Sequence, residues 1–494
     1  MKLSKYIIAL STLVLFAVGG CKKELDINTD PNNAADVDVN LLLPSAQAGI
    51  AFALGNTLQI TGGIWSQYWT QNPSSSQYRS LEQYSPAPSS YDNVWTTLNA
   101  NVLEDLQRVI DKSRGIKKLQ QYEAVATLLK AYTVQLSTDL FGDIPYTEAL
   151  KGDKGILNPK YDPQRVVYDS LFLLVDRGLS LINLVDPHPG NDDLIYQGDM
   201  EKWYRFGNTL KLKLALRLSE VDAGSKAESV IKTLDENFLT EDFFLQSGET
   251  ALISYTATGG NQNPLYSAIA GPVLNETQNL VASSTAINFY NNNDDPRVEV
   301  FYNPTGGSFI GIKQGDYASI SPGTPVSIPS TVVGANATDE ASALAPVKFL
   351  TDYESKFLQA EAVTRGWLPG GDAVAAQLYQ AGIEDNFKAY GLEDAFVAYV
   401  AQPAVAFPAG GSISQKVGAI ITQKWAAMNG TQSIEAWIEW RRTGYPSFFT
   451  PSAASIIGAG RIPQVFLYPT VETTRNSNAP PQRQVYDRVW WDVN

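Results

Sequence analysis

The stretch that decides the fold reads VLEDLQRVI at residues 102–110 and YEAVATLLKAYTVQL at residues 122–136. In both segments apolar side chains recur at three- and four-residue spacings, which is typical of one buried face of an α-helix. The residues between them, 112–121, are mainly polar and predict a short connection. The sequence therefore predicts two amphipathic helices that fold back on each other as a helical hairpin.

The same periodicity continues along the chain on both sides of this hairpin. It returns at residues 167–182 and 203–218, and further candidate helices cover residues 352–366, 372–390, 412–428 and 432–442. Strand alternation is hard to find, so the fold class is predicted to be all-α, or mainly helical. A helix pair cannot bury its apolar face alone and must stack on its neighbours, which favours a tetratricopeptide-like scaffold. No clean repeat of about 34 residues is visible, so an irregular helical bundle is the alternative.

Two regions interrupt the helical pattern: residues 245–347, which are dense in Gly, Asn, Ser, Thr and Pro, and residues 448–494. A structureless loop as long as the first region is improbable in a compact domain. We interpret it as a loop-rich subdomain with short strands, inserted into one helical domain that spans residues 41–494. Long loops on a rigid scaffold often carry binding residues.

The N-terminus has the pattern of an export signal. Lys2 and Lys5 precede an apolar run at residues 6–18, which ends at Gly19, Gly20 and Cys21, so residues 1–20 are predicted to be a signal peptide. Cys21 is the sole cysteine, and its position resembles the lipobox at which bacterial lipoproteins are cleaved and acylated. We expect a lipidated Cys21 followed by a polar tether at residues 21–40, and a mature chain without a transmembrane span. The alternative is cleavage at another small residue beside an incidental cysteine.

Charge and composition exclude several classes of function. Without residues 1–20 the chain keeps 35 basic against 51 acidic residues, because that segment contains two lysines and no acid. Nucleic acids are bound through basic patches, so no nucleic-acid partner is expected. The single histidine, His188, lies in a turn, and Cys21 is assigned to lipidation, so a metal site built on His or Cys is not expected. We also expect no cofactor.

Possible catalytic and calcium-binding groups have simpler structural interpretations. Glu435 and Glu439 would lie on one face of one helix, whereas a glycosidase pair must flank the scissile bond. Pairing of these acids with Arg441 and Arg442 is favoured instead. Residues 291–295 superficially resemble an acidic calcium loop, but a proline follows where such a loop needs glycine, so a turn is favoured. We expect no catalytic residues and no metal site.

Aromatic and amide residues are interleaved between residues 65 and 95, a combination that suits sugar binding because pyranose rings stack on aromatic rings while amides bond their hydroxyls. The same composition suits an extended peptide, and packing of these rings in the core is an equal alternative. A second candidate loop covers residues 259–266. The predicted ligand-binding residues are Trp65, Gln67, Trp69, Tyr78, Arg79, Tyr84, Asn263 and Tyr266.

Four motifs, in this order and spacing, resemble the SusD/RagB family of outer-membrane lipoproteins, and more narrowly its SusD-like, starch-binding-associated branch. They are LFGDIPYTEA at 140–149, DDPR at 294–297, FLQAEA at 357–362 and EAWIEWRRTGYP at 435–446. The resemblance implies a tetratricopeptide-like helical scaffold in a lipid-anchored protein of the outer membrane of Bacteroidota, facing the cell exterior.

The resemblance also implies a partner, a TonB-dependent SusC-type outer-membrane barrel, over which the lipoprotein acts as a hinged lid. On this basis the chain is expected to be a nutrient-binding protein, not an enzyme, that captures a glycan or an oligopeptide and delivers it to the barrel. Two other classes remain open: a structural or adhesive surface lipoprotein, and a glycan-processing enzyme.

Overall fold

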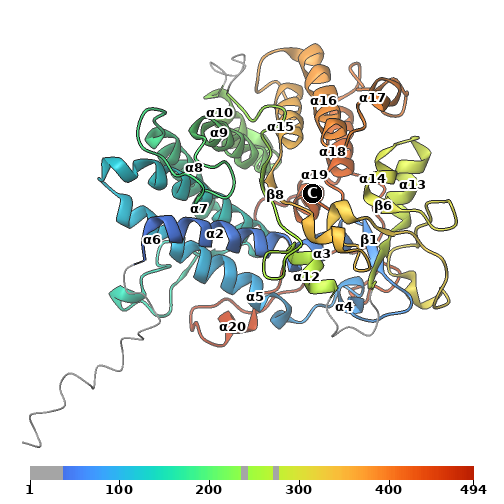
Figure 1. The fold of residues 1–494 in the computed structure, drawn as a ribbon, viewed down its shortest axis with the longest axis horizontal. Coiled ribbons are helices and arrows are strands. Elements are labelled where there is room, and N and C mark those ends of the chain that lie inside the picture. Colours follow the sequence, from blue (N-terminus) through green and yellow to red (C-terminus); the bar gives the residue numbers. More distant parts are fainter. Residues whose placement is uncertain (1–36, 235–242, 271–277) are drawn as a thin grey trace, which may run out of the picture.

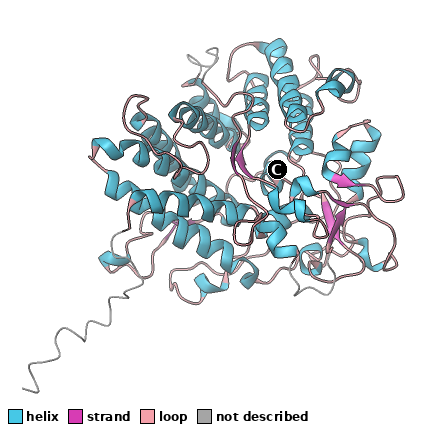
Figure 2. Cartoon of the chain, in the orientation of Figure 1, coloured by secondary structure: helices cyan, strands magenta, loops and turns pink. Residues whose placement is uncertain are grey.

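The computed structural model describes residues 37–234, 243–270 and 278–494, and helices dominate the described chain (Figure 2). The predicted signal peptide, Cys21 and most of the predicted tether lie outside the described residues. The first described helix begins at Val39, so the last two residues assigned to the tether already belong to a helix.

Apart from α2, the longer helices fall where the hydrophobic periodicity predicts them, and shorter helices and two- to four-residue strands fill the remaining segments. The helices are α2 (Val39–Leu54), α3 (Thr57–Trp65), α4 (Arg79–Glu82), α5 (Asp92–Trp95), α6 (Leu103–Ser113), α7 (Gln120–Phe141), α8 (Gln164–Leu181), α9 (Met200–Arg217), α10 (Ser225–Lys232), α12 (Pro264–Ile269), α13 (Ser284–Asn292), α14 (Arg297–Phe301), α15 (Asp352–Thr364), α16 (Gly371–Lys388), α17 (Glu393–Val400), α18 (Ile413–Ala427), α19 (Ser433–Thr443) and α20 (Thr470–Thr473). The strands are β1 (Trp69–Gln71), β2 (Ile144–Pro145), β3 (Tyr161–Asp162), β4 (Ala251–Ile253), β5 (Leu280–Ala282), β6 (Tyr302–Asn303), β7 (Ile328–Pro329) and β8 (Val347–Leu350).

The predicted hairpin at residues 102–136 is confirmed as the pair α6 and α7. Helix α7 is buried on most of its surface and ends at Gly142, whose φ of 73° is a left-handed value that favours glycine. From α6 onward each long helix packs on the next along the chain, α7 on α8 and α8 on α9 (Figure 1). Stacked neighbours of this kind are the arrangement that the predicted helix-pair scaffold requires.

Helices α15, α16, α18 and α19 form the other part of the scaffold, and buried ion pairs join it to α9. The guanidinium of Arg217 on α9 pairs with Glu435 at 2.6 Å and with Glu439, both on α19, and with Asp139 on α7 at 3.1 Å. Because charges taken out of water must be paired, these contacts fix how the three helices meet. We call this group, with Lys213 on α9, the ionic seam: Lys213 lies 3.1 Å from Glu435.

The motifs at residues 357–362 and 435–446 extend this buried network. Arg442 pairs with Glu361 on α15 at 2.7 Å and with Glu439 at 2.7 Å. Arg441 instead donates to the backbone oxygens of Gln464 and Asp139, both at 2.7 Å. Pairing with Arg442 is therefore confirmed for Glu439 alone, since Glu435 pairs with Arg217 and Lys213 on α9 instead. The expected pairing of Arg441 with the two acids is wrong, because its guanidinium is directed toward backbone carbonyls. The two motifs are structural.

The loop-rich insertion is tied to the scaffold through its strands. Strand β5 pairs antiparallel with β1, and β4 pairs antiparallel with β8, while β6 pairs with β7 inside the insertion. Three short helices, α12, α13 and α14, also lie in this region. The segment at residues 245–347 therefore contributes to the same core as the helices that flank it.

One stretch of the described chain, Val39–Trp65, is apolar and long enough to cross a membrane by length and composition alone. In the structure it is two helices, α2 and α3, separated at Gly55 and Asn56, and most of their apolar residues are buried against the rest of the protein, Leu41 and Phe52 excepted. The core therefore accounts for its hydropathy.

Candidate functional site

Three of the rings predicted to bind ligand are core residues. Trp65, Trp69 and Tyr84 are 1%, 0% and 1% exposed. The Trp65 ring lies 5.0 Å from that of Trp437, and its Nε1 donates to the backbone oxygen of Leu81 at 3.2 Å. A ring enclosed in this way has no free face for a ligand. The structure therefore corrects the ligand-binding interpretation of these three residues in favour of packing.

Two of the predicted polar residues are also buried and hold loops together. Gln67 accepts a hydrogen bond from Thr285 Oγ1 at 2.8 Å and donates to the backbone oxygen of Thr450 at 2.7 Å. Asn263 caps α12, accepting from the backbone N–H groups of Leu265 and Tyr266 at 2.8 and 3.1 Å. Their hydrogen-bonding groups serve the fold, so direct contact with a ligand is wrong for both. Tyr266 is half-buried.

The remaining predicted residues, Tyr78 and Arg79, lie nearer the surface. Tyr78 is half-buried, and the exposed Arg79 places its guanidinium 5.1 Å from the centre of the Tyr317 ring. The predicted set therefore does not form one pocket. Composition identified a segment rich in rings and amides but could not show which way each side chain points.

A surface pocket with the expected chemistry lies elsewhere, beside α13. We call it the ring–amide pocket; its volume is 400 Å³. It is lined by Ser284, Thr285, Asn288, Phe289, Asn292, Asn293, Phe448 and Thr450. The Phe289 and Phe448 rings are tilted by 32° with centres 5.8 Å apart, and Phe448 is 39% exposed.

The local sequence explains this arrangement. Ser283 caps α13 by accepting from the backbone N–H of Thr285 at 3.2 Å. Residues 285, 288, 289 and 292 then follow at helical spacing and share one face. Phe448 arrives from the loop after α19 and completes the pocket.

The buried segment at residues 67–69 supports the ring–amide pocket from beneath. The Trp425 ring lies 5.3 Å from both Phe289 and Phe448, and Tyr68 stacks on Trp425 at 5.1 Å. Gln67 joins Thr285 on one wall to Thr450 on the other. The segment singled out in the sequence thus positions this pocket without lining it.

The lining of the ring–amide pocket suits an uncharged polar ligand with flat apolar faces. None of its described lining residues is charged; they supply two rings, three amides and three hydroxyls. Rings stack on the C–H face of a sugar, while amides and hydroxyls bond its oxygens and any acetamido group. The signal that sequence reasoning missed is the cluster of asparagines around Phe289 in residues 288–293, followed far along the chain by Phe448.

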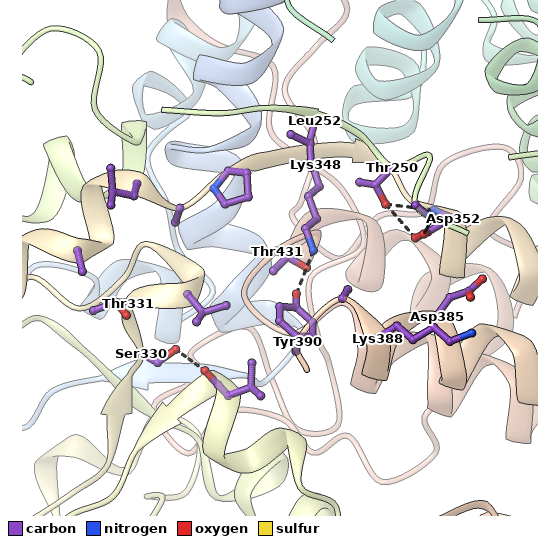
Figure 3. Close-up of a pocket in the computed structure, with 18 of the residues that line it drawn as sticks. Thr250, Leu252, Ser330, Thr331, Lys348, Asp352, Asp385, Lys388, Tyr390 and Thr431 are labelled. Carbon is purple, nitrogen blue, oxygen red and sulfur yellow. Dashed lines mark hydrogen bonds between the residues drawn. The ribbon is translucent and has the colours of Figure 1, made fainter. Parts of the chain in front are cut away.

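A larger cavity of 970 Å³ lies between the insertion, β8, α15 and α16 (Figure 3). We call it the Lys348 cavity. Lys348 extends from β8 toward Tyr390 at the end of α16, and its Nζ donates to the Tyr390 hydroxyl at 3.0 Å. Asp352 and Asp385 also line it.

Comparison with known proteins decides the family. The family model described as "SusD-like_2: Starch-binding associating with outer membrane" matches residues 31–469. The chain belongs to this SusD-like family. Members associate with the outer membrane, bind glycans at the cell surface and in general do not catalyse reactions. A comparison with curated proteins found no match.

Solved structures similar to this SusD-like chain include two chitin binders. A chitin-binding protein aligns with a TM-score of 0.75 and 25% identity over 92% of this chain and 100% of its own. A chitin-binding SusD homolog from Flavobacterium johnsoniae aligns with a TM-score of 0.75 and 23% identity over 91% of this chain and 99% of its own. A SusD homolog from Bacteroides uniformis aligns with a TM-score of 0.72 and 22% identity over 92% of this chain and 99% of its own. The predicted family and the mainly helical fold are confirmed.

The groups weighed for catalysis and metal binding have structural partners in this SusD-like fold. Asp295 forms a buried ion pair with Arg297 at 2.6 Å, and Nδ1 of His188 lies 2.8 Å from the backbone oxygen of Pro189. Within residues 37–234, 243–270 and 278–494, no group of three His, Cys, Asp or Glu side chains is placed to hold a metal ion. The turn at residues 291–296 is therefore held by an ion pair inside the protein.

Proposed function

We propose that this chain is a lipid-anchored nutrient-binding protein of the cell surface, which captures a glycan in the ring–amide pocket. The pocket itself is the observation that carries the proposal: two tilted rings beside amides and hydroxyls in a family of glycan-binding surface proteins. An oligopeptide, the other ligand class open at the outset, is not favoured here because the described lining offers no charge to a peptide terminus.

Oligomers of N-acetylglucosamine are the first ligands to test, because two structurally similar proteins are chitin binders. Their acetamido groups offer one donor and one acceptor each, which the side-chain amides of Asn288, Asn292 and Asn293 can satisfy. The sugar faces would lie against Phe289 and Phe448. The walls are held apart at a fixed width by Gln67, so little ordering is needed on binding.

Isothermal titration calorimetry of the detergent-purified lipoprotein with a panel of neutral oligosaccharides tests the proposal. Phe448→Ala should weaken binding by about 1 to 3 kcal/mol, as for a recognition residue, while Phe52→Ala is the matched control. Phe52 is 49% exposed on α2 and does not line the pocket. Equal affinity for wild type and Phe448→Ala would assign glycan binding to another surface.

The delivery step in the proposal is a lid over a TonB-dependent SusC-type barrel, with Cys21 as the acylated anchor and the body facing the cell exterior. The family resemblance supports this step. Extraction of the native membrane in mild detergent should co-purify such a barrel, and Cys21→Ala should abolish incorporation of labelled fatty acid. A lipoprotein that binds surfaces but never a barrel would instead favour the adhesive alternative.

A further inference from the structure

The Lys348 cavity contains a buried ammonium group with only neutral partners. Lys348 is 8% exposed, and its Nζ donates to the hydroxyls of Tyr390 at 3.0 Å and Tyr353 at 3.4 Å. Burial raises the pKa of Tyr353 above its usual range, so this hydroxyl is neutral at pH 7. Among the described residues no carboxylate lies within ion-pair distance of Lys348. An ammonium has three N–H donors, and two of them are used.

The cavity also contains two carboxylates near its Lys348 wall, and one of them has an oxygen without a hydrogen-bond partner among the described residues. Asp352 accepts from the backbone N–H groups of Gly248 at 2.7 Å and Tyr353 at 2.9 Å and from the Thr250 hydroxyl at 2.8 Å. Asp385 is buried, and its Oδ2 has no hydrogen-bond partner within the described part of the chain. Burial is the main cause that raises the pKa of Asp385. Lys388 is already paired with Glu384 at 2.8 Å.

The ammonium group of Lys348 and the carboxylates of Asp352 and Asp385 lie at different positions on the walls of the cavity. On the wall formed by β8 and α15, Lys348 lies four residues before Asp352. On the other wall Asp385 lies in α16, and Tyr390 follows five residues later, just after that helix ends. The labelled side chains in Figure 3 show Lys348 beside Tyr390, with Asp385 and Lys388 together on the α16 ribbon. A ligand with one positive and one negative end would therefore meet both kinds of group.

The remaining lining distinguishes this cavity from the ring–amide pocket. It mixes aliphatic residues with hydroxyl and amide side chains and one further acid, Glu299, and Tyr390 is the one ring among the described lining residues. The larger aliphatic residues are Leu252, Val300, Val332, Leu344 and Pro346. Such walls suit aliphatic side chains, whereas a sugar would lack a ring on which to stack. The volume of 970 Å³ is within the range of pockets that enclose small ligands.

We propose that the Lys348 cavity is a second binding site, which takes a short peptide with free termini. The peptide carboxylate pairs with Lys348 and accepts from Tyr390, and its ammonium group pairs with Asp385 and Asp352. This site is independent of the glycan function proposed above, because none of its lining residues belongs to the ring–amide pocket.

Calorimetry with trialanine and trileucine on the full detergent-purified chain tests this site. Each peptide is used free, C-terminally amidated and N-terminally acetylated. We expect the free peptides to bind and each cap to weaken binding about tenfold or more, which corresponds to about 1.4 kcal/mol. Lys348→Met should weaken binding of the free peptide by at least this factor, without a further effect on the amidated peptide.

Variants on both sides of the cavity keep the result interpretable. Asp385→Asn should weaken binding of the free peptide but not of the N-terminally acetylated peptide. It replaces Lys348→Met as the test variant if Lys348→Met does not fold. Lys232→Met replaces an exposed lysine that is paired with Glu228. It is the matched control and should leave the affinity for the free and the capped peptides unchanged. Lys348→Met should leave glycan affinity unchanged, which separates the two sites. Absence of peptide binding, equal binding of capped and free peptides, or preference for an oligoglucuronate would overturn the proposal.

Discussion

Replacing Trp69 by alanine separates a core residue from a ligand-binding one. The ring is completely buried and packs directly on two glycines: a Cβ built on Gly63 would lie 2.3 Å from its Cε3, and one built on Gly430 would lie 3.0 Å from its Cζ2. Backbone on both sides prevents collapse into the space that the ring leaves. Loss of a buried Trp in such a site costs about 3 to 5 kcal/mol of unfolding free energy.

The indole Nε1 of Trp69 has no hydrogen-bond partner among the described residues, so the substitution removes packing alone. Thermal denaturation should show a clearly lower Tm for Trp69→Ala, and calorimetry on the folded fraction should show unchanged glycan affinity. Phe448→Ala, which removes a partly exposed ring, should instead lower the glycan affinity and leave the Tm nearly unchanged. A Trp69→Ala protein with an unchanged Tm and lost glycan binding would refute the assignment of this ring to the core.

Three further predictions concern the core. Arg217→Met leaves the acids of the ionic seam without their shared cation and should cost about 3 to 5 kcal/mol of unfolding free energy in urea titrations; a loss below about 1 kcal/mol would contradict the seam. Burial raises the pKa of Glu82 to about 7. Because the folded state keeps this proton longer than the unfolded one, stability should fall by about 3 kcal/mol as pH rises from about 4.5 to 7. Glu82→Gln should flatten that decline in Tm, and an unchanged profile would exclude Glu82 as its cause. Gly63→Ala, which drives a methyl into Trp69, should lower the unfolding free energy by about 1 to 3 kcal/mol, and an unchanged Tm would contradict that contact.

The scaffold could be predicted because its helices follow period 3.6. The segments at 102–110 and 122–136 became α6 and α7, and the motif at 435–446 lies in α19 and the loop that follows it. Those features depend on residues near one another in sequence. The ionic seam could be predicted only in part: Glu435 and Glu439 share a helix face, but Arg217 joins them from α9, more than two hundred residues earlier.

The site could not be predicted, because its residues come together only through tertiary packing. Phe289 and Phe448 belong to α13 and to a loop after α19, and no local pattern relates them. The density of aromatic residues at 65–84 suggested ligand binding. In the structure, however, β1 in this segment pairs with β5 and is buried on both faces. Gln67 shows how the prediction was partly useful, since this residue supports the pocket wall without touching its interior.

A crystal structure of the protein with an N-acetylglucosamine oligomer tests the central claim most directly. The account predicts sugar density against the Phe289 and Phe448 rings, with acetamido groups within hydrogen-bond distance of the side-chain amides of α13. Sugar bound in the Lys348 cavity, or over Tyr78 and Arg79 with the ring–amide pocket empty, would contradict it.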